Sequence, residues 1–546
     1  MSPTYPRLRR RVLIGLFVGS ALALAAVTGL LLNISERKSE ERQYPLILNK
    51  LSDDQVDPAV WGVSFPAQYG RYRLMAEPGT ATNYGGGHPY SKLMRNPALR
   101  RLWGGYPFSL DFNEDRSHYF AAIDQFETKR NDKDWINAHG LPGFKGQPGA
   151  CMNCHSGWAP SLIRELGWET FNHTPYNDLK GMLIKQHGAG MAGHALGSTC
   201  ADCHHPSDMS LRVTRPAYIN AMVARGYKGD PKAGLLATHE EMRSHVCQQC
   251  HVEYYFKGEQ KVLTFPWSQW PKNEPLRIEM IEAYYDREAA RPDGFKADWT
   301  HGETGAPMLK MQHPETELYS SSVHARTGVS CADCHMPYRR EGAVKVTDHF
   351  IASPLLNINA SCQTCHHIAE EKLRARVDLI QQRTATQLKE AEGAILALMD
   401  DIVAASKELD KERVKGTSIP DDVYKAKVDK VLAAARQAHR RASMRWDFIS
   451  SENSTGFHSP QEAARVLGAA TQLARVGQLS LVNDLATVGI HIRPTAGYGL
   501  VPAAGNPIEP RHAPVGDPPG QALLDLDLKV EAMITPLGVA GETTAK

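Results

Sequence analysis

The sequence predicts a mainly α-helical protein with few strands and with long helices toward the C-terminus. Two features lead to this prediction. Residues 61–366 are rich in glycine, proline and aromatic residues, and they contain short elements but no strand-rich segment. After residue 366, apolar residues recur mostly at steps of three and four, which is the pattern of amphipathic helices. The chain has 546 residues, which is too long for one ordinary globular core, so we expect two or more domains.

The overall composition narrows the class of protein. A hydrophobic content of 42% indicates a globular protein rather than a disordered or mostly membrane-embedded one. The formal net charge is only +2, which gives no reason to expect a nucleic-acid partner.

The N-terminus has the features of a membrane segment. A basic stretch at residues 1–11 precedes an uncharged run at residues 12–32, and about 20 apolar residues suffice to span a bilayer as a helix. Arginines before the run keep the N-terminus in the cytoplasm, so we expect the rest of the chain to be exported. The run ends without a good cleavage site, which favours a retained anchor followed by a linker at residues 33–60. The alternative is a cleaved signal peptide and a soluble periplasmic protein.

Every cysteine belongs to one repeated motif, Cys-x-x-Cys-His, which occurs five times. The cysteines are Cys151, Cys154, Cys200, Cys203, Cys247, Cys250, Cys331, Cys334, Cys362 and Cys365, and the histidines that follow are His155, His204, His251, His335 and His366. Two thiols at this spacing form thioethers with one haem, and the next imidazole binds its iron. A single motif would also suit zinc or a disulfide, but five motifs with no cysteine left over predict five covalently bound c-type haems.

The expected haems explain the weak periodicity of residues 61–366. Large haems replace much of a side-chain core, so we interpret this region as a multihaem cytochrome c with a haem-packed core. Covalent haem is attached outside the cytoplasm, which agrees with export to the periplasmic side of the membrane.

Residues 367–490 are expected to be helical. Apolar residues from Leu373 to Ile402 follow one helix face, a second helix is expected at about residues 420–449, and Ser459-Pro460-Gln461-Glu462 has the pattern of a capping box. An intramolecular bundle and a homodimer interface are equally compatible with these helices. Residues 491–546 form a tail rich in proline and glycine, in which residues 521–534 have the pattern of a short helix.

The number of axial ligands separates an electron carrier from an enzyme. A haem that only transfers electrons usually has two strong axial ligands, whereas a haem that binds substrate leaves one position open. The five motifs supply one histidine for each iron. Whether the protein is an electron carrier or an enzyme therefore depends on how many further axial ligands the chain provides.

Several segments resemble one known family. They are GYPFSLDFNEDRSHYFAAID (105–124), CADCH (200–204), CQQCHVEYYF (247–256), FPW (265–267), PMLKMQHPE (307–315), SVHARTGVSCADCHMP (322–337), TDH (347–349) and MRWDFISSENSTGFHSPQEAARVLG (444–468). In order and spacing they resemble the pentahaem, ammonia-forming cytochrome c nitrite reductases over roughly residues 60–490. The resemblance implies a periplasm-facing enzyme that reduces nitrite to ammonium with six electrons.

The resemblance also implies four distal haem ligands. His349 would serve the second haem, His118 the third, His458 the fourth and His324 the fifth. Nine axial ligands then fill ten positions, and the open position belongs to the first haem.

Beside that open position, the resemblance implies three catalytic residues and a calcium site. The catalytic residues are Arg130, Tyr254 and His313, with Arg116 as a competing candidate for the arginine. The calcium ligands are Glu253, Tyr254, Gln312 and the backbone carbonyl of Lys310. We expect Tyr255, the next residue, to serve packing.

The first motif departs from the commonest family pattern, which ends in lysine where this chain has His155. Family variants with histidine exist, so the assignment stands. Because imidazole and amine differ as donors, the iron's potential and the preference for nitrite stay open.

Two other functions stay open at this point. One is a multihaem electron conduit with no reaction of its own, and the other is a reductase that prefers hydroxylamine or sulfite. The expected partners are nitrite, a quinol-oxidising membrane cytochrome or another electron donor, the membrane through the N-terminal helix, and a second copy of the chain.

Overall fold

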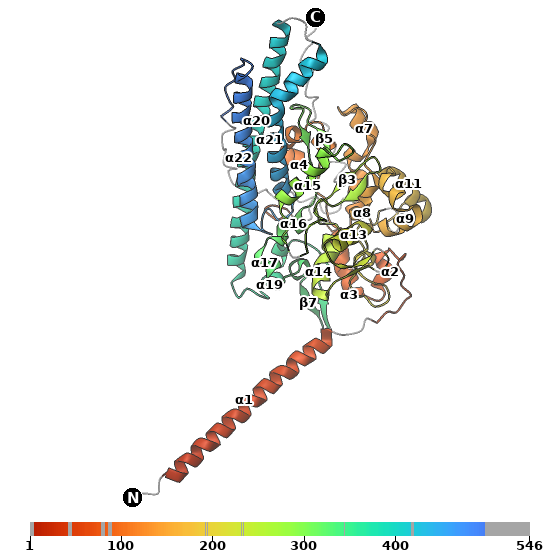
Figure 1. The fold of residues 1–546 in the computed structure, drawn as a ribbon. Coiled ribbons are helices and arrows are strands. Elements are labelled where there is room, and N and C mark those ends of the chain that lie inside the picture. Colours follow the sequence, from red (N-terminus) through yellow and green to blue (C-terminus); the bar gives the residue numbers. More distant parts are fainter. Residues whose placement is uncertain are drawn as a thin grey trace, which may run out of the picture.

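The computed structural model describes residues 5–41, 46–77, 82–85, 90–191, 193, 195–230, 232, 234–272, 274–342, 344–415 and 420–496. This part of the chain is mainly α-helical, as predicted, and its three longest C-terminal helices stand beside a region of short elements (Figure 1). The expected short helix at residues 521–534 and the tail beyond residue 496 lie outside the described residues.

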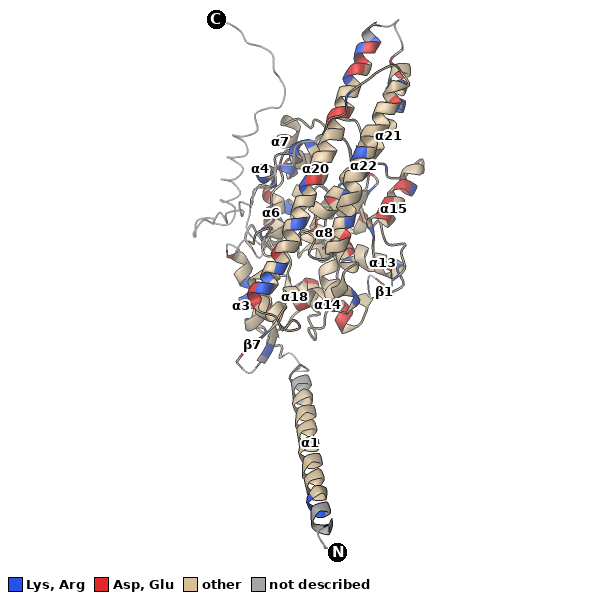
Figure 2. Ribbon diagram, turned by 90° about the vertical axis from the view of Figure 1, so that its left-hand side faces the viewer, with Lys and Arg blue, Asp and Glu red and all other residues tan. Residues whose placement is uncertain are grey.

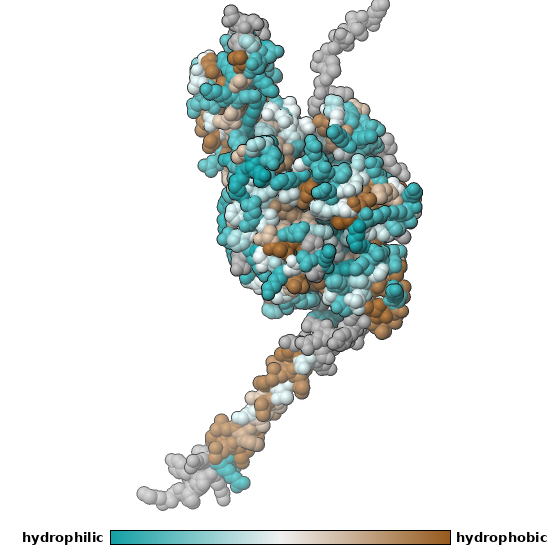
Figure 3. Space-filling model, turned by 45° about the vertical axis from the view of Figure 1, so that its right-hand side comes forward, coloured by the Kyte–Doolittle hydropathy of each residue, from teal (hydrophilic) through white to brown (hydrophobic). Residues whose placement is uncertain are grey.

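Helix α1 (Tyr5–Glu41) contains the whole apolar run and continues past it. Its segment from residue 10 to residue 35 has a mean hydropathy of 2.2, none of it is buried, and it is long and apolar enough to cross a membrane. The helix projects away from the rest of the molecule, and its surface is largely hydrophobic where the body is mixed (Figures 1 and 3). Helix α1 therefore includes the first residues of the predicted linker.

The predicted C-terminal helices are confirmed as α20 (Glu370–Lys415), α21 (Asp421–Ser450) and α22 (Pro460–Ala486). They pack against one another in an intramolecular bundle, with many of the charged residues on the outward faces (Figure 2). Of the two arrangements that the sequence allowed, the structure contains the intramolecular bundle. A homodimer interface stays a prediction.

The start of α22 differs from the predicted capping box. The helix begins at Pro460, but the side chain of Ser459 makes no capping hydrogen bond. The Glu462 carboxylate is instead engaged by Arg465 at 2.6 Å, and the same guanidinium reaches Glu279 at 2.7 Å. These ion pairs hold the glutamate away from the backbone N–H that a capping box would need.

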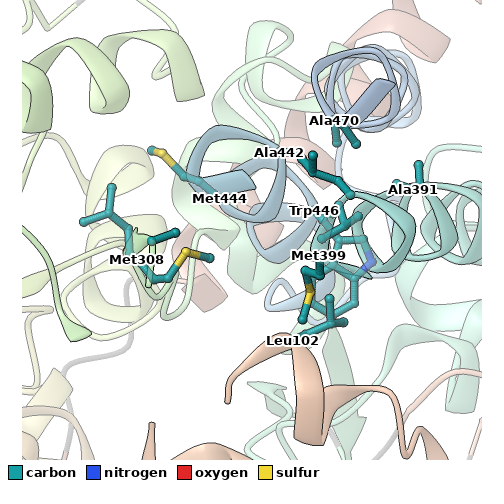
Figure 4. Packing of buried hydrophobic residues seen from close by; sticks show 14 of the residues in the cluster. Leu102, Met308, Ala391, Met399, Ala442, Met444, Trp446 and Ala470 are labelled. Carbon is teal, nitrogen blue, oxygen red and sulfur yellow. The ribbon is translucent and has the colours of Figure 1, made fainter. Parts of the chain in front are cut away.

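The bundle is joined to the preceding region by a shared hydrophobic core. Trp446 and Met444 leave α21 on different sides, Trp446 toward Met399 and Leu102, and Met444 toward Met308 (Figure 4). The Trp446 indole also donates a hydrogen bond to the carbonyl of Leu388 at 3.1 Å. Because truncation of a buried aromatic residue costs about 3–5 kcal/mol, this core fixes α21 against the haem-motif region.

The region between α1 and the bundle is made of short helices. They are α2 (Pro58–Gly62), α3 (Pro66–Arg73), α4 (Lys92–Arg95), α5 (Leu99–Leu102), α6 (Ala121–Glu127), α7 (Lys133–Ala138), α8 (Met152–His155), α9 (Ala159–Leu166), α10 (Trp168–His173), α11 (Tyr176–His187), α12 (Cys200–Cys203), α13 (Pro216–Ala224), α14 (His239–Gln248), α15 (Ile278–Ala290), α16 (Glu315–Ser320), α17 (Val323–Arg326), α18 (Cys331–His335) and α19 (Ile358–Ser361).

Strands are few, as the sequence predicts. They form four antiparallel hairpins, β1 (Lys228–Asp230) with β2 (Gly234–Leu236), β3 (Tyr255–Lys257) with β4 (Val262–Thr264), β5 (Trp299–Thr300) with β6 (Pro307–Met308) and β7 (Tyr338–Glu341) with β8 (Val344–Thr347). The hairpins connect motifs to the residues that follow them: β3 begins directly after Tyr254, and β8 ends two residues before His349.

Candidate functional site

One continuous cavity of about 3210 Å³ collects all five Cys-x-x-Cys-His motifs. It is lined by all ten cysteines, all of them free of disulfides, and by the five histidines that follow them. Its volume is about three times the upper range of roughly 1,000 Å³ for pockets that bind one drug-sized ligand. The lining suits several large cofactors held by thioether bonds, and it contradicts a framework of disulfides.

The two motifs with the sequence CADCH share one local structure. In each, the aspartate accepts a hydrogen bond from the backbone N–H that precedes the first cysteine, at 2.7 Å for both Asp202 and Asp333. An arginine then binds each carboxylate, Arg215 at 2.7 Å and Arg243 at 2.8 Å. The capped turn fixes the first cysteine of each motif at the start of its helix, α12 or α18.

Arg215 also ties the first motif to the second. Its guanidinium is almost fully buried and donates to the backbone carbonyls of Asn153 and Ser156, on either side of the first motif's histidine. The first and second motifs are therefore held against each other by one side chain.

The structure brings each expected distal histidine opposite the expected proximal one. The ring centres are 6.2 Å apart for His204 and His349, 5.9 Å for His251 and His118, 6.4 Å for His335 and His458, and 6.2 Å for His366 and His324. Two imidazoles on opposite sides of one metal keep a separation of about 6 Å, since each metal–nitrogen bond is about 2 Å long. The four pairs fit four irons with two histidine ligands each.

The histidine of the first motif has no such counterpart. Among the described residues, no second imidazole ring faces His155 at this distance. Burial lowers the pKa of His155 to about 3, with smaller contributions from His313 and Arg130. Its ring is therefore neutral at neutral pH, which is the form that binds a metal.

His251 has a second ring neighbour, His313, at 6.2 Å. The Nδ1 atoms of His251 and His313 both approach the Glu315 carboxylate, at 3.8 and 3.9 Å.

The geometry favours Arg130 over Arg116 as the anion-binding arginine. Arg116 is neutralised by the buried carboxylate of Asp124, which binds both its guanidinium and its backbone N–H. A carboxylate, Asp111, also accepts from the Arg130 backbone N–H at 3.2 Å, but within the described part of the chain the guanidinium has no carboxylate partner: its Nη1 donates to the Thr128 hydroxyl at 3.0 Å, and its Nε is buried without an acceptor. Its guanidinium lies 4.7 Å from the ring centre of Phe108, which holds it in place at the cavity wall.

Tyr254 and His313 line the same cavity as Arg130 and the first motif. Burial raises the pKa of Tyr254 well above 10, and the neighbouring Cys154 and Cys151 add to the effect. The phenol therefore keeps its proton at any working pH and can donate it in a hydrogen bond. Tyr255, by contrast, points into the hydrophobic core and bonds to the Tyr284 hydroxyl at 2.7 Å, as its expected packing role requires.

The expected calcium ligand Glu253 is a buried carboxylate that contacts Gln312. Glu253 is completely buried; one of its oxygens accepts from the Gln312 backbone N–H at 2.6 Å, and the other has no hydrogen-bond partner. Burial raises the pKa of Glu253 well above its usual range. A neighbouring carboxylate, Glu317, accepts from the Glu253 backbone N–H at 3.0 Å and also has an unpartnered buried oxygen. Unpaired buried oxygens of this kind suit a hard cation such as calcium.

The side chain of Lys310 is engaged by other residues. Its ammonium group is bound 3.0 Å from the carboxylate of Asp447 and 3.0 Å from the Ser451 hydroxyl, which leaves the backbone carbonyl as the expected calcium ligand. Among the described residues, no cluster of three or more His, Cys, Asp or Glu side chains could hold a metal ion. A calcium ion here would thus depend on carbonyl and amide oxygens besides the buried carboxylates of Glu253 and Glu317.

Sequence reasoning missed three carboxylates that lie beside the Nδ1 atoms of candidate ligands. Glu452 is 3.2 Å from His458, Glu315 is 3.8 Å from His251, and Asp115 is 3.9 Å from His155. Carboxylates in this position fix the tautomer of a metal-binding histidine and raise its basicity. The only signal available in the sequence was their closeness to other motif residues, since Asp115 precedes His118 by three positions and Glu315 follows His313 by two.

Comparison with known proteins gives one consistent result. The profile of the cytochrome c552 family matches residues 57–498. The chain is 34% identical over 478 residues to cytochrome c-552 of Bacteroides fragilis, which covers 87% of this chain and 86% of that protein. It is 32% identical over 480 residues to cytochrome c-552 of Porphyromonas gingivalis, with 87% and 86% covered.

A solved structure agrees with these relatives. The catalytic subunit of the cytochrome c nitrite reductase of Desulfovibrio desulfuricans, which is described for its two calcium sites, superposes with a TM-score of 0.67 at 29% identity. The match covers 81% of this chain and 89% of that subunit.

Proposed function

Because the chain belongs to the cytochrome c552 family, we propose that it is an ammonia-forming cytochrome c nitrite reductase with five c-type haems and bound calcium. The first motif would hold the haem at which nitrite is reduced with six electrons, and the other four motifs would hold the haems that supply those electrons. The observation that carries the proposal is the arrangement of histidines: four pairs face each other across one cavity, and His155 stands without a partner.

The haems supply the electrons and the iron that binds nitrite; the surrounding side chains bind the anion and move protons. Arg130 is buried, carries a permanent positive charge and has a free donor, so it holds an oxygen of nitrite by a charge-assisted hydrogen bond. His313 delivers protons to the oxygens, which leave as water. Tyr254 keeps its phenolic proton and steadies the departing oxygen through a hydrogen bond.

Calcium has a supporting role in this proposal. Held by Glu253 and by oxygens of Tyr254, Lys310 and Gln312, it would fix the segment that carries Tyr254 and the loop that carries His313. Its charge would also add positive potential near an anionic substrate. The unpartnered oxygen of Glu253 supports this assignment.

The location and partners follow from the N-terminus and the haems. We propose that α1 is a retained membrane anchor with the catalytic region on the periplasmic side. The electron donor would then be a quinol-oxidising cytochrome in the same membrane, and a second copy of the chain would pair through the C-terminal helices. A cleaved signal sequence is the alternative for α1, and N-terminal sequencing of the mature protein separates the two.

An electron conduit without its own reaction is not favoured, because it would need a tenth axial ligand opposite His155.

The direct experiment combines a spin-state spectrum of the oxidised holoprotein with an assay of ammonium formed from nitrite. We expect one high-spin and four low-spin haems, and ammonium in proportion to nitrite consumed. Five low-spin haems and no ammonium would overturn the proposal. Parallel assays with hydroxylamine and sulfite measure which substrate His155 favours.

A further inference from the structure

A single carboxylate lies between the electron-transfer chain and the reaction site. The Oε1 atom of Glu315 is 3.8 Å from Nδ1 of His251, the proximal ligand of the third haem, and 3.9 Å from Nδ1 of His313. The glutamate is 7% exposed, so the carboxylate itself is buried, and both imidazoles line the cavity that holds the five motifs.

Backbone contacts hold this carboxylate in place. The next residue, Thr316, donates from both its backbone N–H, at 3.3 Å, and its hydroxyl to the carbonyl of His251. Asn453 donates to Oε1 of Glu315 from its side chain at 2.6 Å and from its backbone at 3.3 Å. These contacts fix the backbone beside Glu315 against His251 and hold one carboxylate oxygen through Asn453.

The contacts leave Glu315 with unused hydrogen-bonding capacity. Its Oε2 atom is buried without a partner, and so is Nδ1 of His313. Buried polar groups are normally hydrogen-bonded, and a small rotation of either side chain would bring Nδ1–H of His313 within hydrogen-bond distance of Oε2 of Glu315. Glu315 can therefore accept from both imidazoles, one oxygen for each.

We propose, on the basis of the function proposed above, that Glu315 is a positioning residue that holds His251 and His313 through their Nδ1 atoms. By accepting from His251, it makes that imidazole a stronger ligand and lowers the reduction potential of the third haem. By accepting from His313, it fixes the tautomer that presents Nε2 to the substrate. One side chain then affects both the reduction potential of the third haem and the tautomer of the proton-donating His313.

The test is Glu315→Gln in the complete holoenzyme, with the third-haem potential read by potentiometric titration with electron paramagnetic resonance. We expect that potential to rise, because the amide is a weaker acceptor than the carboxylate. Turnover of nitrite should fall by about 10–100-fold, the usual effect of losing such a partner. The fall should appear in kcat more than in KM, because Arg130 still binds the anion.

A matched control is Glu452→Gln. Glu452 lies 3.2 Å from Nδ1 of His458, the distal ligand of the fourth haem, and it has no contact with His313. This variant should raise the potential of the fourth haem and leave that of the third unchanged.

Glu315→Asp is the second variant, should the glutamine variant assemble poorly. The aspartate keeps the negative charge on a shorter side chain. We therefore expect a smaller rise in the third-haem potential than in the glutamine variant, and a turnover of nitrite between those of the wild type and the glutamine variant. A wild-type potential of the third haem in both variants would overturn the inference. A raised potential with wild-type kcat and KM would also overturn it, because Glu315 would then act on His251 alone. The potential of the third haem is measured without any turnover of nitrite, whose absence in the wild type would instead refute the proposed function.

Discussion

The ammonium group of Lys310 lies 3.0 Å from both carboxylate oxygens of Asp447 on α21. The two side chains are only 2% and 3% exposed. The same carboxylate accepts from the backbone N–H of Met311 at 2.8 Å. Through this pair, the loop that carries Gln312 and His313 is attached to the C-terminal bundle.

Replacing Asp447 by asparagine should loosen that loop. The substitution leaves the Lys310 cation buried without its counter-charge, and removing one partner of a buried pair costs about 3–5 kcal/mol. We expect a lower midpoint of thermal unfolding and a weaker affinity for calcium. Glu408→Gln is the control, because Glu408 pairs with Lys411 in an exposed position, where a pair contributes at most about 1 kcal/mol. Equal midpoints for the two variants would contradict the structural role of Asp447.

Tyr254→Phe should keep all five haems and reduce nitrite turnover. Only the hydroxyl is lost, and positioned proton donors contribute on the order of 100-fold or more to a rate. The control is the next residue, Tyr255→Phe, which removes a hydroxyl that bonds to Tyr284 inside the hydrophobic core. That variant should lose about 1 kcal/mol of stability and keep its turnover. Wild-type turnover in Tyr254→Phe would remove this residue from the mechanism.

Much of this fold was predictable because its signals are local. The spacing within each Cys-x-x-Cys-His motif identifies a haem site without reference to the rest of the chain. The periodicity of α20, α21 and α22 lies within each helix, and it predicted where each one begins to within a few residues, although α20 continues 13 residues beyond Ile402.

The carboxylates of the site could not be predicted in this way. Asp447 meets Lys310 across 137 positions, and Glu315 meets His251 across 64, so no local pattern marks either contact. The capping box failed in part for a local reason, because Arg465, three residues after Glu462 on the same helix, binds its carboxylate; the distant Glu279 binds the same guanidinium. Long-range ion pairs depend on packing that the sequence does not display.

His155→Lys should give an active enzyme with an altered absorption spectrum. The buried surroundings of His155 favour a neutral side chain, and they would favour a neutral amine for the same reason, so the lysine could bind the iron. An amine and an imidazole differ as donors, which changes the iron's potential. The measurement is a spectrum of the oxidised protein together with nitrite turnover. A variant that retains only four haems would show that the first motif requires histidine.

Removal of calcium should lower activity without releasing haem. Treatment with a chelator leaves the two buried carboxylates, Glu253 and Glu317, without a counter-charge, so the segment that carries Tyr254 should become less ordered. Elemental analysis should find calcium in the purified protein, and Glu253→Gln should lose it. Glu259→Gln, at an exposed position after the same motif, is the control and should retain the metal. A purified, active enzyme without calcium would refute the site.

His439 should make the bundle sensitive to acid. Its ring is completely buried on α21, where Nδ1 lies 3.1 Å from the Thr304 hydroxyl and Nε2 has no partner. Burial lowers the pKa of His439 well below 6.5, and the nearby His301 lowers it further. Below a pH of about 6.5 the unfolded chain binds a proton that the folded chain does not, so stability falls by about 1.4 kcal/mol per pH unit.

The replacement His439→Gln removes this titration and keeps a side chain that can bond to Thr304. Between pH 7.5 and pH 5.5, the wild type should therefore lose about 1.4 kcal/mol more stability than the variant. Only the pH unit from about 6.5 to 5.5 lies below the pKa of the histidine in the unfolded chain. Thermal unfolding of the two holoproteins at both values measures the difference. His491→Gln is the control, since His491 is exposed and its loss should leave the acid sensitivity of the wild type intact. If His439→Gln loses as much stability on acidification as the wild type, the acid sensitivity originates elsewhere in the molecule.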